Sequence, residues 1–291
     1  MSLAVRDVAG ILADNLRLRG SVLPVPARRA TRWARDLGLP RGGETVLYTG
    51  MMYQLVPYIE RLVTLEQRLG GTPLARLAGL ARRVNRVVSL VSLAARPSRA
   101  ERAEADRVPA TVARLLRAAG VEFGSLYSDD LYAGALAHDL GADSAVAVHA
   151  RRVAAIFARY GVREVITIDP HTTYMLRTVY PRLVPGFDVR VRSYLEVLAE
   201  RGLPHPAPTE PAPPESAPQA SRVVIHDSCL YARAGNVIQA PRDLLAAAGV
   251  TVGEPDCVTM CPICLVNLRK AADGSLRVRD ISEYLDESAA R

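Results

Sequence analysis

The sequence predicts an α/β protein made of two pseudo-symmetric Rossmann-like lobes with parallel strands, the second lobe shortened, and an N-terminal helical segment. Short β-branched runs alternate with longer stretches of helical periodicity, which is typical of parallel sheets connected by helices. The same order of elements occurs twice along the chain, as an internal repeat. With 291 residues and 49% hydrophobic residues, the chain is long enough to bury a substantial core.

The individual elements follow from hydrophobic periodicity and from the residues that start and stop helices. Gly161 is placed to end a long helix, and Pro170 to begin the next one. The alternating residues 189–194 are either an edge strand or the start of the following helix. The expected strands are residues 45–49, 121–126, 165–168, 189–194, 223–226 and 276–278. The expected helices are residues 8–18, 31–37, 52–69, 77–95, 102–119, 135–140, 145–160, 173–179, 194–201, 240–248, 265–270 and 282–289.

A change of composition after residue 202 suggests how the chain is divided. Residues 203–220 hold seven prolines without apolar periodicity, which is typical of a semi-extended linker. All four cysteines follow this linker, so the first lobe is expected to carry none. The expected parts are an N-terminal helical segment at 1–44, a first lobe at 45–202, the linker at 203–220 and a second lobe at 221–291.

Charge and membrane patterning exclude several partners. The formal net charge is +7, but the arginines are spread along the chain, aromatic residues make up only 5%, and no recognition motif is present, so no nucleic-acid partner is expected. Residues 77–95 are the best membrane candidate, but Arg82, Arg83 and Arg86 interrupt them, and no transmembrane segment is expected. We expect an amphipathic helix that docks on a protein surface, with membrane-surface binding as the alternative.

The use of cysteine indicates the compartment. Four cysteines in a chain this long do not form the disulfide framework of a secreted domain. Three of them lie within eight positions, from Cys257 to Cys264, which suits a metal or redox site in a reducing compartment. No signal peptide is expected, because residues 1–20 lack an uninterrupted apolar core. Together these features predict a cytoplasmic protein.

The chemistry of the chain is concentrated in Cys257-Val-Thr-Met-Cys-Pro-Ile-Cys264, where a β-like run stops and a helical pattern begins. The free N–H groups in the first turn of a helix stabilise thiolates. A Cys-x-x-Cys at such a junction can therefore hold a metal or cluster, or act as a dithiol. Cys229 ends another β-like run, residues 223–229.

The internal repeat relates this junction to the first half of the chain. The matching pairs of segments are 46–53 with 224–231, 115–124 with 244–253, and 165–177 with 257–269. Gly124 and Thr167 are 43 positions apart, whereas Gly253 and Thr259 are 6 positions apart, so the second copy lacks about 37 residues. We therefore expect the second lobe to lose a crossover helix and to connect its parallel strands in another way.

The second-lobe motifs resemble a known family. The segments are His226-Asp-Ser-Cys-Leu-Tyr-Ala-Arg233, Ala240-Pro-Arg-Asp-Leu-Leu245 and Thr259-Met-Cys-Pro-Ile-Cys-Leu-Val-Asn-Leu268. They resemble the cysteine-rich CCG domain of the HdrB-type component of heterodisulfide reductase and its relatives, which include iron–sulfur subunits of anaerobic glycerol-3-phosphate, glycolate and lactate oxidation systems. The resemblance covers about residues 15–284. Each lobe of that family carries a lone Cys, a Cys-Cys-Gly and a Cys-x-x-Cys, which together hold an iron–sulfur cluster.

Carried over by position, the resemblance assigns roles to the cysteines of the second lobe. Cys229 corresponds to the lone Cys, and Cys261 and Cys264 to the final pair, so these three are the expected catalytic and cofactor-binding residues. The Cys-Cys-Gly falls within the missing residues. Cys257 corresponds to Val165, a core strand position, and is either a further cluster or metal ligand or a buried small apolar side chain.

In the first lobe the corresponding positions carry no cysteine. Met51 stands at the lone Cys, Tyr132-Ala-Gly134 at the Cys-Cys-Gly, and Asp169 and Thr172 at the final pair. The first cluster is therefore expected to be absent. His171, next to Asp169, is interpreted as a pocket-lining imidazole beside a helix cap, with proton relay as the alternative.

The resemblance implies a [4Fe–4S] cluster, which takes four ligands, usually thiolates. With Cys229, Cys261 and Cys264 as three ligands, the fourth is Cys257, a solvent species, a substrate thiolate or a residue of a partner. Zinc is the alternative occupant, since the cysteines with His226 nearby also satisfy tetrahedral S/N ligation. A scaffold without any metal is the remaining alternative.

The implied function is that of an oxidoreductase subunit similar to the HdrB-type component of heterodisulfide reductase or of a related dehydrogenase complex. It would pass electrons between a flavoprotein or ferredoxin-like partner subunit and a thiol, disulfide or quinone-linked acceptor. The sequence has no flavin or ferredoxin motif of its own, so a partner is required, and any membrane association would be peripheral and go through that partner. The alternative is a non-catalytic zinc-binding or assembly subunit that keeps the fold.

Overall fold

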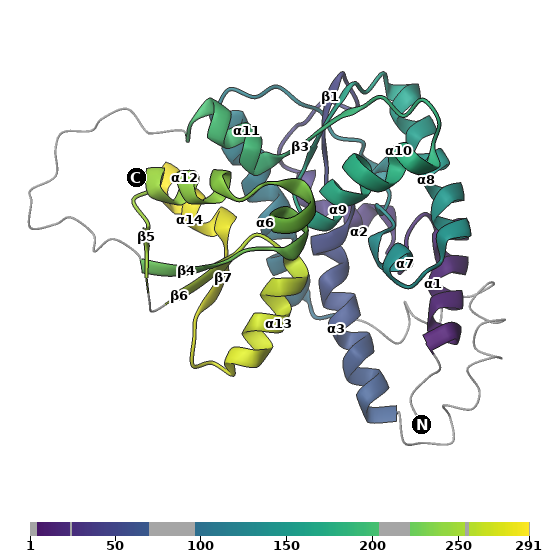
Figure 1. Cartoon of the computed structure of the whole chain (residues 1–291), viewed down its shortest axis with the longest axis horizontal. Helices are drawn as coiled ribbons and strands as arrows, with labels where there is room; N and C mark the ends of the chain where they lie inside the picture. Colours follow the sequence, from purple (N-terminus) through teal and green to yellow (C-terminus); the bar gives the residue numbers. More distant parts are fainter. Residues whose placement is uncertain (1–4, 24, 70–96, 204–221, 254–255, 291) are drawn as a thin grey trace, which may run out of the picture.

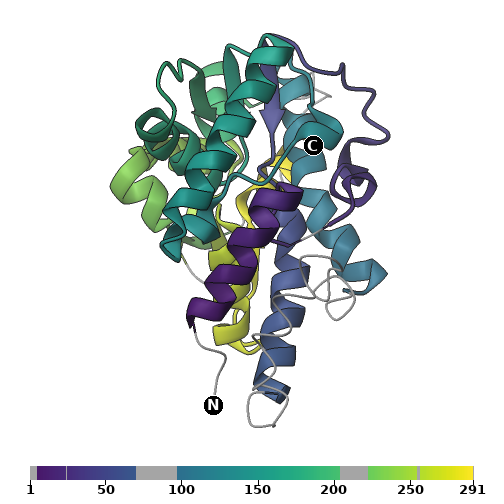
Figure 2. The same cartoon turned by 90° about the vertical axis from the view of Figure 1, so that its right-hand side faces the viewer.

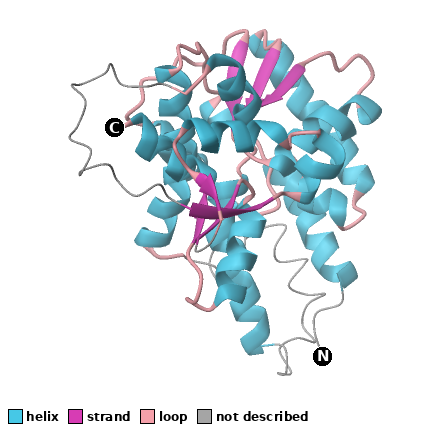
Figure 3. Ribbon diagram, turned by 60° about the vertical axis from the view of Figure 1, so that its left-hand side comes forward, coloured by secondary structure: helices cyan, strands magenta, loops and turns pink. Residues whose placement is uncertain are grey.

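The computed structural model shows two separate parallel sheets with helices packed around them (Figure 1, Figure 3). It describes residues 5–23, 25–69, 97–203, 222–253 and 256–290. The first sheet has the order β1 (Thr45–Tyr48), β2 (Glu164–Thr167), β3 (Arg190–Ser193). The second has the order β5 (Thr251–Val252), β4 (Arg222–His226), β6 (Asp256–Thr259), β7 (Val278–Asp280). Every pairing is parallel, so the predicted α/β class is confirmed.

Helices occupy most of the positions that the periodicity predicts. The described helices are α1 (Val5–Arg19), α2 (Ala27–Ala30), α3 (Met52–Leu69), α6 (Arg99–Ala118), α7 (Ala135–Asp139), α8 (Asp143–Tyr160), α9 (Pro170–Tyr174), α10 (Tyr180–Leu183), α11 (Tyr194–Arg201), α12 (Gln239–Ala247), α13 (Pro262–Ala272) and α14 (Ile281–Ala289). Short 3₁₀ turns form at Arg32–Ala34 and Tyr127–Asp129, and π turns at Met175–Val179 and Tyr231–Gly235. The predicted amphipathic helix 77–95 and nearly all of the predicted linker 203–220 lie outside the described residues.

One strand prediction is wrong, and another is displaced, since the strand expected at residues 276–278 is observed at Val278–Asp280. Residues 121–126 do not form a strand: Gly124 makes an isolated bridge to Val46 of β1, and Ser125 makes one to Arg41, before β1 begins. Gly124 donates its N–H to the Thr45 carbonyl at 2.9 Å, and a Cβ at Gly124 would lie 1.8 Å from the carbonyl oxygen of Gly42. The short strand β5 was not predicted. At residues 189–194 both alternatives hold in part, since β3 is an edge strand that leads directly into α11.

The register of the two sheets confirms the internal repeat. Val46 pairs with Val165 in the first sheet, and Val224 pairs with Cys257 in the second, as the match between the two copies requires. The Gly253 N–H donates to the Val223 carbonyl at 2.8 Å, which repeats the contact of Gly124 with β1. The two lobes are therefore copies of one arrangement at the level of single hydrogen bonds.

The missing residues of the second copy have a clear structural counterpart. In the first lobe the chain between Gly124 and β2 builds α7 and α8 (Figure 1). In the second lobe β5 and β6 flank β4 directly, and only residues 253–255 connect them. The expected loss of a crossover helix is thus confirmed. The end of β5 and the start of β6 lie at the same level of β4, since Val252 and Asp256 both pair with Val223.

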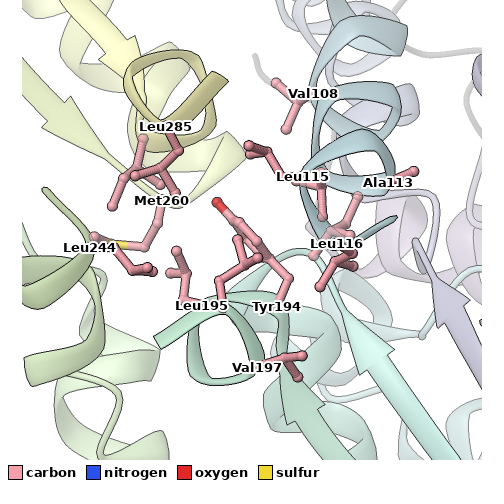
Figure 4. Packing of buried hydrophobic residues seen from close by; sticks show 14 of the residues in the cluster. Val108, Ala113, Leu115, Leu116, Tyr194, Leu195, Val197, Leu244, Met260 and Leu285 are labelled. Carbon is pink, nitrogen blue, oxygen red and sulfur yellow. The ribbon is translucent and has the colours of Figure 1, made fainter. Parts of the chain in front are cut away.

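Two hydrophobic cores hold the molecule together. One joins the N-terminal segment to the first lobe, where α1 packs on α7 and α8 (Figure 2). The other, the shared core, lies between the lobes (Figure 4). In it, Leu115, Tyr194 and Leu195 of the first lobe pack with Leu244 and Met260 of the second. The second lobe therefore buries its main apolar surface against the first. The lobe boundaries at residues 45, 203 and 221 stay a prediction.

Candidate metal centre

The candidate site lies at the carboxyl edge of the second sheet. Cys229 follows β4, and Cys261 and Cys264 follow β6, the strand beside it. The last rung between these strands pairs His226 with Thr259. Because neighbouring parallel strands end at the same edge, the fold directs these residues toward one region, as in other open α/β sheets.

The cysteine pair is built into the start of α13. Cys261 is the N-cap residue, its sulfur accepts the backbone N–H of Cys264 at 3.5 Å, and Pro262 supplies the fixed φ that suits the first helical position. Cys261 is buried, whereas Cys264 is half-buried. A hydrogen bond between the two thiols lowers the pKa of Cys264, and the neighbouring His226 and His171 lower it further. The same hydrogen bond, together with burial, raises the pKa of Cys261. Of the two thiols, Cys264 is therefore the one that more readily forms a thiolate.

The corresponding junction of the first lobe faces this pair. Asp169 caps α9 by accepting the backbone N–H groups of His171 and Thr172 at 2.9 and 3.0 Å. This confirms the predicted helix cap. The Nδ1 atom of His171 lies 3.9 Å from Cys261 Sγ and 3.7 Å from Asp169 Oδ1. Burial lowers the pKa of His171, but the hydrogen bond and charge of Asp169 outweigh it and raise that pKa overall.

The other two cysteines lie in different surroundings. Cys257 is only 5% exposed and forms a small apolar cluster with Leu265 and Val278, and this burial raises the pKa of its thiol. Cys229 is exposed. The structure brings Cys261 and Cys264 together but does not place Cys257 with them. The roles of Cys229 and Cys257 as ligands stay a prediction.

The donor set fits an iron–sulfur cluster in part. A cubane cluster takes four ligands, usually thiolates, and the close pair Cys261 and Cys264 supplies two. Among the residues that the structure describes, no three His, Cys, Asp or Glu side chains converge as a preformed metal site. The described cysteines alone therefore do not assemble a four-thiolate set.

In the first lobe, the position that corresponds to the cysteine pair is occupied by closely packed side chains. Thr172 lies so close to Gly50 that a Cβ added to Gly50 would be 2.2 Å from Thr172 Oγ1. The buried carboxylate of Asp130 accepts the Thr49 hydroxyl at 2.8 Å and the Thr49 and Gly50 N–H groups at 3.0 and 3.3 Å. The sequence analysis did not predict that Asp130 binds the backbone after β1. The only sequence feature that pointed to it was the acidic pair Asp129-Asp130 before Tyr132.

Two residues near Cys229 have structural partners of their own. The Asp227 carboxylate accepts two hydrogen bonds from Arg242, at 2.7 and 2.9 Å. The Tyr231 ring is fully buried, and its hydroxyl lies 2.7 Å from Ser193 Oγ of the first lobe. Asp227 thus serves an ion pair within the second lobe, and Tyr231 joins the lobes.

A cavity of about 400 Å³ lies between α3, α6 and α13. Its apolar wall includes Tyr53 and Val56 of α3 and Pro262 and Leu265 of α13. Acidic and basic side chains of α3, α6 and α13 form its rim. Pro262, which directly follows Cys261 in the chain, lines this cavity, whereas Cys261 and Cys264 do not. Among the described helices, none combines the length and apolar content needed to cross a bilayer.

The fold and site together define a two-lobed α/β protein with a Cys-x-x-Cys centre, and its similar proteins are named as redox proteins. EtfAB:quinone oxidoreductase of Syntrophomonas wolfei is 33% identical over 148 residues, 51% of this chain and 20% of that protein. A probable membrane-anchored ferredoxin of Chromohalobacter salexigens is 30% identical over 154 residues, 51% of this chain and 22% of that protein. The probable iron-sulfur-binding oxidoreductase FadF of Bacillus subtilis is 29% identical over 143 residues, 49% of this chain and 19% of that protein.

These similarities have a limited extent. The chain spans only about a fifth of the length of these curated relatives. No protein-family model matches the chain. No solved structure matches it either.

Proposed function

We propose that this protein is an iron–sulfur redox subunit of a larger electron-transfer system. The observation that carries the proposal is the Cys261–Cys264 pair, which caps α13 at the carboxyl edge of two parallel strands and favours a thiolate. The names of the relatives, which include a ferredoxin and an iron-sulfur-binding oxidoreductase, support the same class.

Within this proposal, Cys261 and Cys264 hold the centre. The cluster, when bound, supplies one-electron transfer. The fold supplies the rest: the first turn of α13 offers its N–H groups to the thiolates, and Cys261 is almost completely buried. Cys229 and Cys257 are the remaining cysteine candidates for ligands.

The proposed partners follow from what the chain lacks and from its cavity. A flavoprotein or ferredoxin-like subunit would exchange electrons with the centre, since the sequence has no flavin or ferredoxin motif of its own. The acceptor would be a thiol, a disulfide or a quinone-linked group, as in systems resembling heterodisulfide reductase. The cavity between α3 and α13, which Pro262 lines, would offer such an acceptor an apolar binding surface.

The test is spectroscopic. Anaerobically purified full-length protein should absorb near ~400 nm and contain iron and acid-labile sulfide. Cys264→Ser should lose both, while the control Asn267→Ser, at an exposed position later on the same helix, should keep them. Colourless protein without iron would contradict the proposal.

Zinc binding in a non-catalytic or assembly subunit is the second candidate. The interaction of His226 with Cys264 favours it, because a thiolate and an imidazole together suit tetrahedral zinc. Stoichiometric zinc in place of iron in the same preparation would support this alternative.

A further inference from the structure

A second cavity adjoins the one between α3, α6 and α13. The first cavity has a volume of about 400 Å³, within the range of about 300–1,000 Å³ that small-molecule sites occupy. The second, of about 240 Å³, lies along α3 and α13, which pack side by side (Figure 1). Val56 and Glu60 of α3 and Val266 and Lys270 of α13 line both cavities. These four residues therefore form the boundary between the two cavities.

Both cavities offer apolar surface. Tyr53, Val108 and Leu265 line the first cavity, and all three side chains are buried in its floor. Val63 and Ile263 line the second. Val63 is 44% exposed, although large aliphatic side chains are usually buried. An elongated apolar molecule that ran through both cavities would cover this surface.

The charged side chains at the boundary are unpaired. Four other charged residues of the first cavity form ion pairs, namely Glu101, Glu104, Arg269 and Glu283. Among the residues that the structure describes, the side chains of Glu60, Lys270 and Arg107 make no hydrogen bond or ion pair, and Arg107 lines the first cavity only. One carboxyl group and one ammonium group are thus available to a ligand at the boundary.

The position of the cysteines decides which kind of acceptor suits these cavities. Pro262 lines the first cavity, whereas Cys261 and Cys264 line neither. A thiol or disulfide held there could not bond to the centre through sulfur, because neither cysteine borders the space. A quinone needs no such bond, since it accepts electrons across intervening atoms. Consecutive Cα atoms are about 3.8 Å apart, so the chain from Cys261 to Pro262 is a short path for an electron.

We propose that the two cavities form a quinone-binding site, with the quinone ring in the first cavity, its apolar side chain in the second, and Glu60 and Lys270 as hydrogen-bond donors to its carbonyl oxygens. This inference rests on the proposed function, because the centre at Cys261 and Cys264 would supply the electrons. Two successive one-electron transfers and two protons convert the two carbonyl groups of the quinone into the two hydroxyl groups of the quinol. The flavoprotein or ferredoxin-like partner reduces the centre again after each transfer.

Glu60 is suited to deliver one of these protons. Partial burial and the nearby carboxylates of Glu101 and Glu104 raise the pKa of Glu60, and the cations Arg269 and Arg61 offset this rise only in part. The protonated carboxyl group can give its proton to a reduced carbonyl oxygen. It can then regain a proton from water, because Glu60 lies at the exposed rim. The second proton comes from solvent.

The first experiment uses Lys270, the only lysine of the chain, as a reporter. Full-length protein prepared without oxygen is treated with an amine-acetylating reagent, with and without a fully substituted para-benzoquinone that carries a decyl chain. Mass spectrometry then measures the acetylation of Lys270. The quinone should slow acetylation of Lys270 and leave that of the N-terminal amine unchanged. Decanoic acid, which has a similar apolar chain but no quinone ring, should not protect Lys270.

Variants locate the bound quinone by equilibrium dialysis. Val266→Trp fills the boundary between the cavities and should abolish binding. Lys270→Met removes a charged hydrogen-bond donor and should weaken the affinity about tenfold. Arg114→Gln is the matched control, because it removes a cation of α6 that lines neither cavity, and it should keep the affinity.

The role of Glu60 is tested on the reduced protein, freed of excess reductant and mixed with the same quinone. The rate at which the centre is reoxidised should fall in wild type as the pH rises and Glu60 loses its proton. Glu60→Gln should bind the quinone but be reoxidised about 100-fold more slowly at low pH, with no such dependence on pH. Equal rates in the two proteins would overturn the role of Glu60.

The outcomes separate the inference from the proposed function. Iron and sulfide in a wild type whose Lys270 is not protected would overturn the inference and leave the proposed function standing. Equal protection by decanoic acid, or a quinone affinity that stays unchanged in both Val266→Trp and Lys270→Met, would also overturn the inference. Protection of Lys270 by the quinone in a protein without iron would support the quinone site and overturn the proposed function.

Discussion

At the scale of single residues, the same structural position serves two different purposes in the two lobes. Asp169 caps α9, which follows β2, and Cys261 caps α13, which follows β6. Both residues are followed by proline. The carboxylate oxygen accepts N–H groups at 2.9–3.0 Å, and the larger sulfur accepts one at 3.5 Å. The cap geometry thus tolerates oxygen or sulfur, and only sulfur turns the position into a soft metal ligand.

Asp130 gives a prediction about pH. Burial raises the pKa of Asp130 to about 7 in the folded protein. The pKa of an Asp in an unfolded chain is about 3.9. Between these values the folded protein holds a proton that the unfolded chain has lost. The stability that this proton contributes is present below about pH 4 and is lost as the pH rises through about 7. Asp130→Asn should therefore gain stability relative to wild type across this range, by up to about 1.4 kcal/mol per pH unit.

Urea unfolding at several pH values across the range measures this difference. Asp129→Asn is the control: burial raises the pKa of Asp129, but hydrogen bonds from Tyr160 and Arg41 outweigh it and lower that pKa overall. It should show no gain with rising pH. A stability difference between Asp130→Asn and wild type that stays constant would mean that Asp130 is ionised throughout.

Cys257 gives a second prediction. Its side chain packs with Leu265 and Val278, and valine occupies the matching position 165 in the first lobe. Cys257→Val should change the free energy of unfolding by less than about 1.5 kcal/mol and should leave the metal content unchanged. Cys264→Val should lose the metal. A folded Cys257→Val protein without metal would instead identify Cys257 as a ligand.

At the scale of elements, the helices after the edge strands tie the lobes together. Ser193 caps α11 and Asp280 caps α14, each in a capping box with a glutamate at the third helical position. Each cap also receives a tyrosine from the other lobe: Tyr231 lies 2.7 Å from Ser193 Oγ, and Tyr53 donates to Asp280 at 2.6 Å. The contacts are reciprocal, so the pseudo-symmetry extends to the interface.

Removing either of these caps should therefore lower the free energy of unfolding more than removing a cap that has no tyrosine partner. Asp280→Ala removes a cap and leaves the buried Tyr53 hydroxyl without its acceptor, which should cost about 2–3 kcal/mol of unfolding free energy. Ser98→Ala is the matched control, since Ser98 forms an exposed capping box on α6 with no tyrosine, and it should cost about 1 kcal/mol. Denaturant unfolding of both variants measures the difference. Equal costs would mean that the tyrosine contact adds nothing.

At the scale of the whole molecule, the shared core couples the lobes. Leu115 and Tyr194 of the first lobe pack in one cluster with Leu244 and Leu285 of the second (Figure 4). Within its described residues, 222–253 and 256–290, the second lobe has one small separate cluster, formed by Cys257, Leu265 and Val278. We therefore expect the second lobe to depend on the first for its stability.

This coupling predicts a single cooperative unfolding transition. Trp33, the only tryptophan, lies in the shared core, and the thiol of Cys257 is buried in the second lobe. Tryptophan fluorescence and the reactivity of this buried thiol should change at the same denaturant concentration. Leu244→Ala should shift both probes equally, by about 2–5 kcal/mol. Thiol exposure at a lower denaturant concentration than the fluorescence change would show that the second lobe unfolds independently.

The sequence by itself determined the order of the elements, the internal repeat and the identity of the capped cysteine junction. These features are local: periodicity, caps and prolines act within a few residues of the chain, so they can be read without knowing what packs against them. The match between the two copies equated Val46 with Val224 and Val165 with Cys257, and the structure shows that these residues pair at equivalent positions of the two sheets.

Only the tertiary structure decided which side chains meet. Successive residues of a strand point to opposite faces, so the sequence alone did not decide whether Cys257 is a core residue or a metal ligand. In the structure, α13 packs near β6 and β7, and Cys257 lies in an apolar cluster with Leu265 and Val278. The contact of His171 with Cys261 joins residues 90 positions apart, and it exists because the two lobes bury their common core against each other. Such a contact depends on how two elements dock, and no local pattern encodes it.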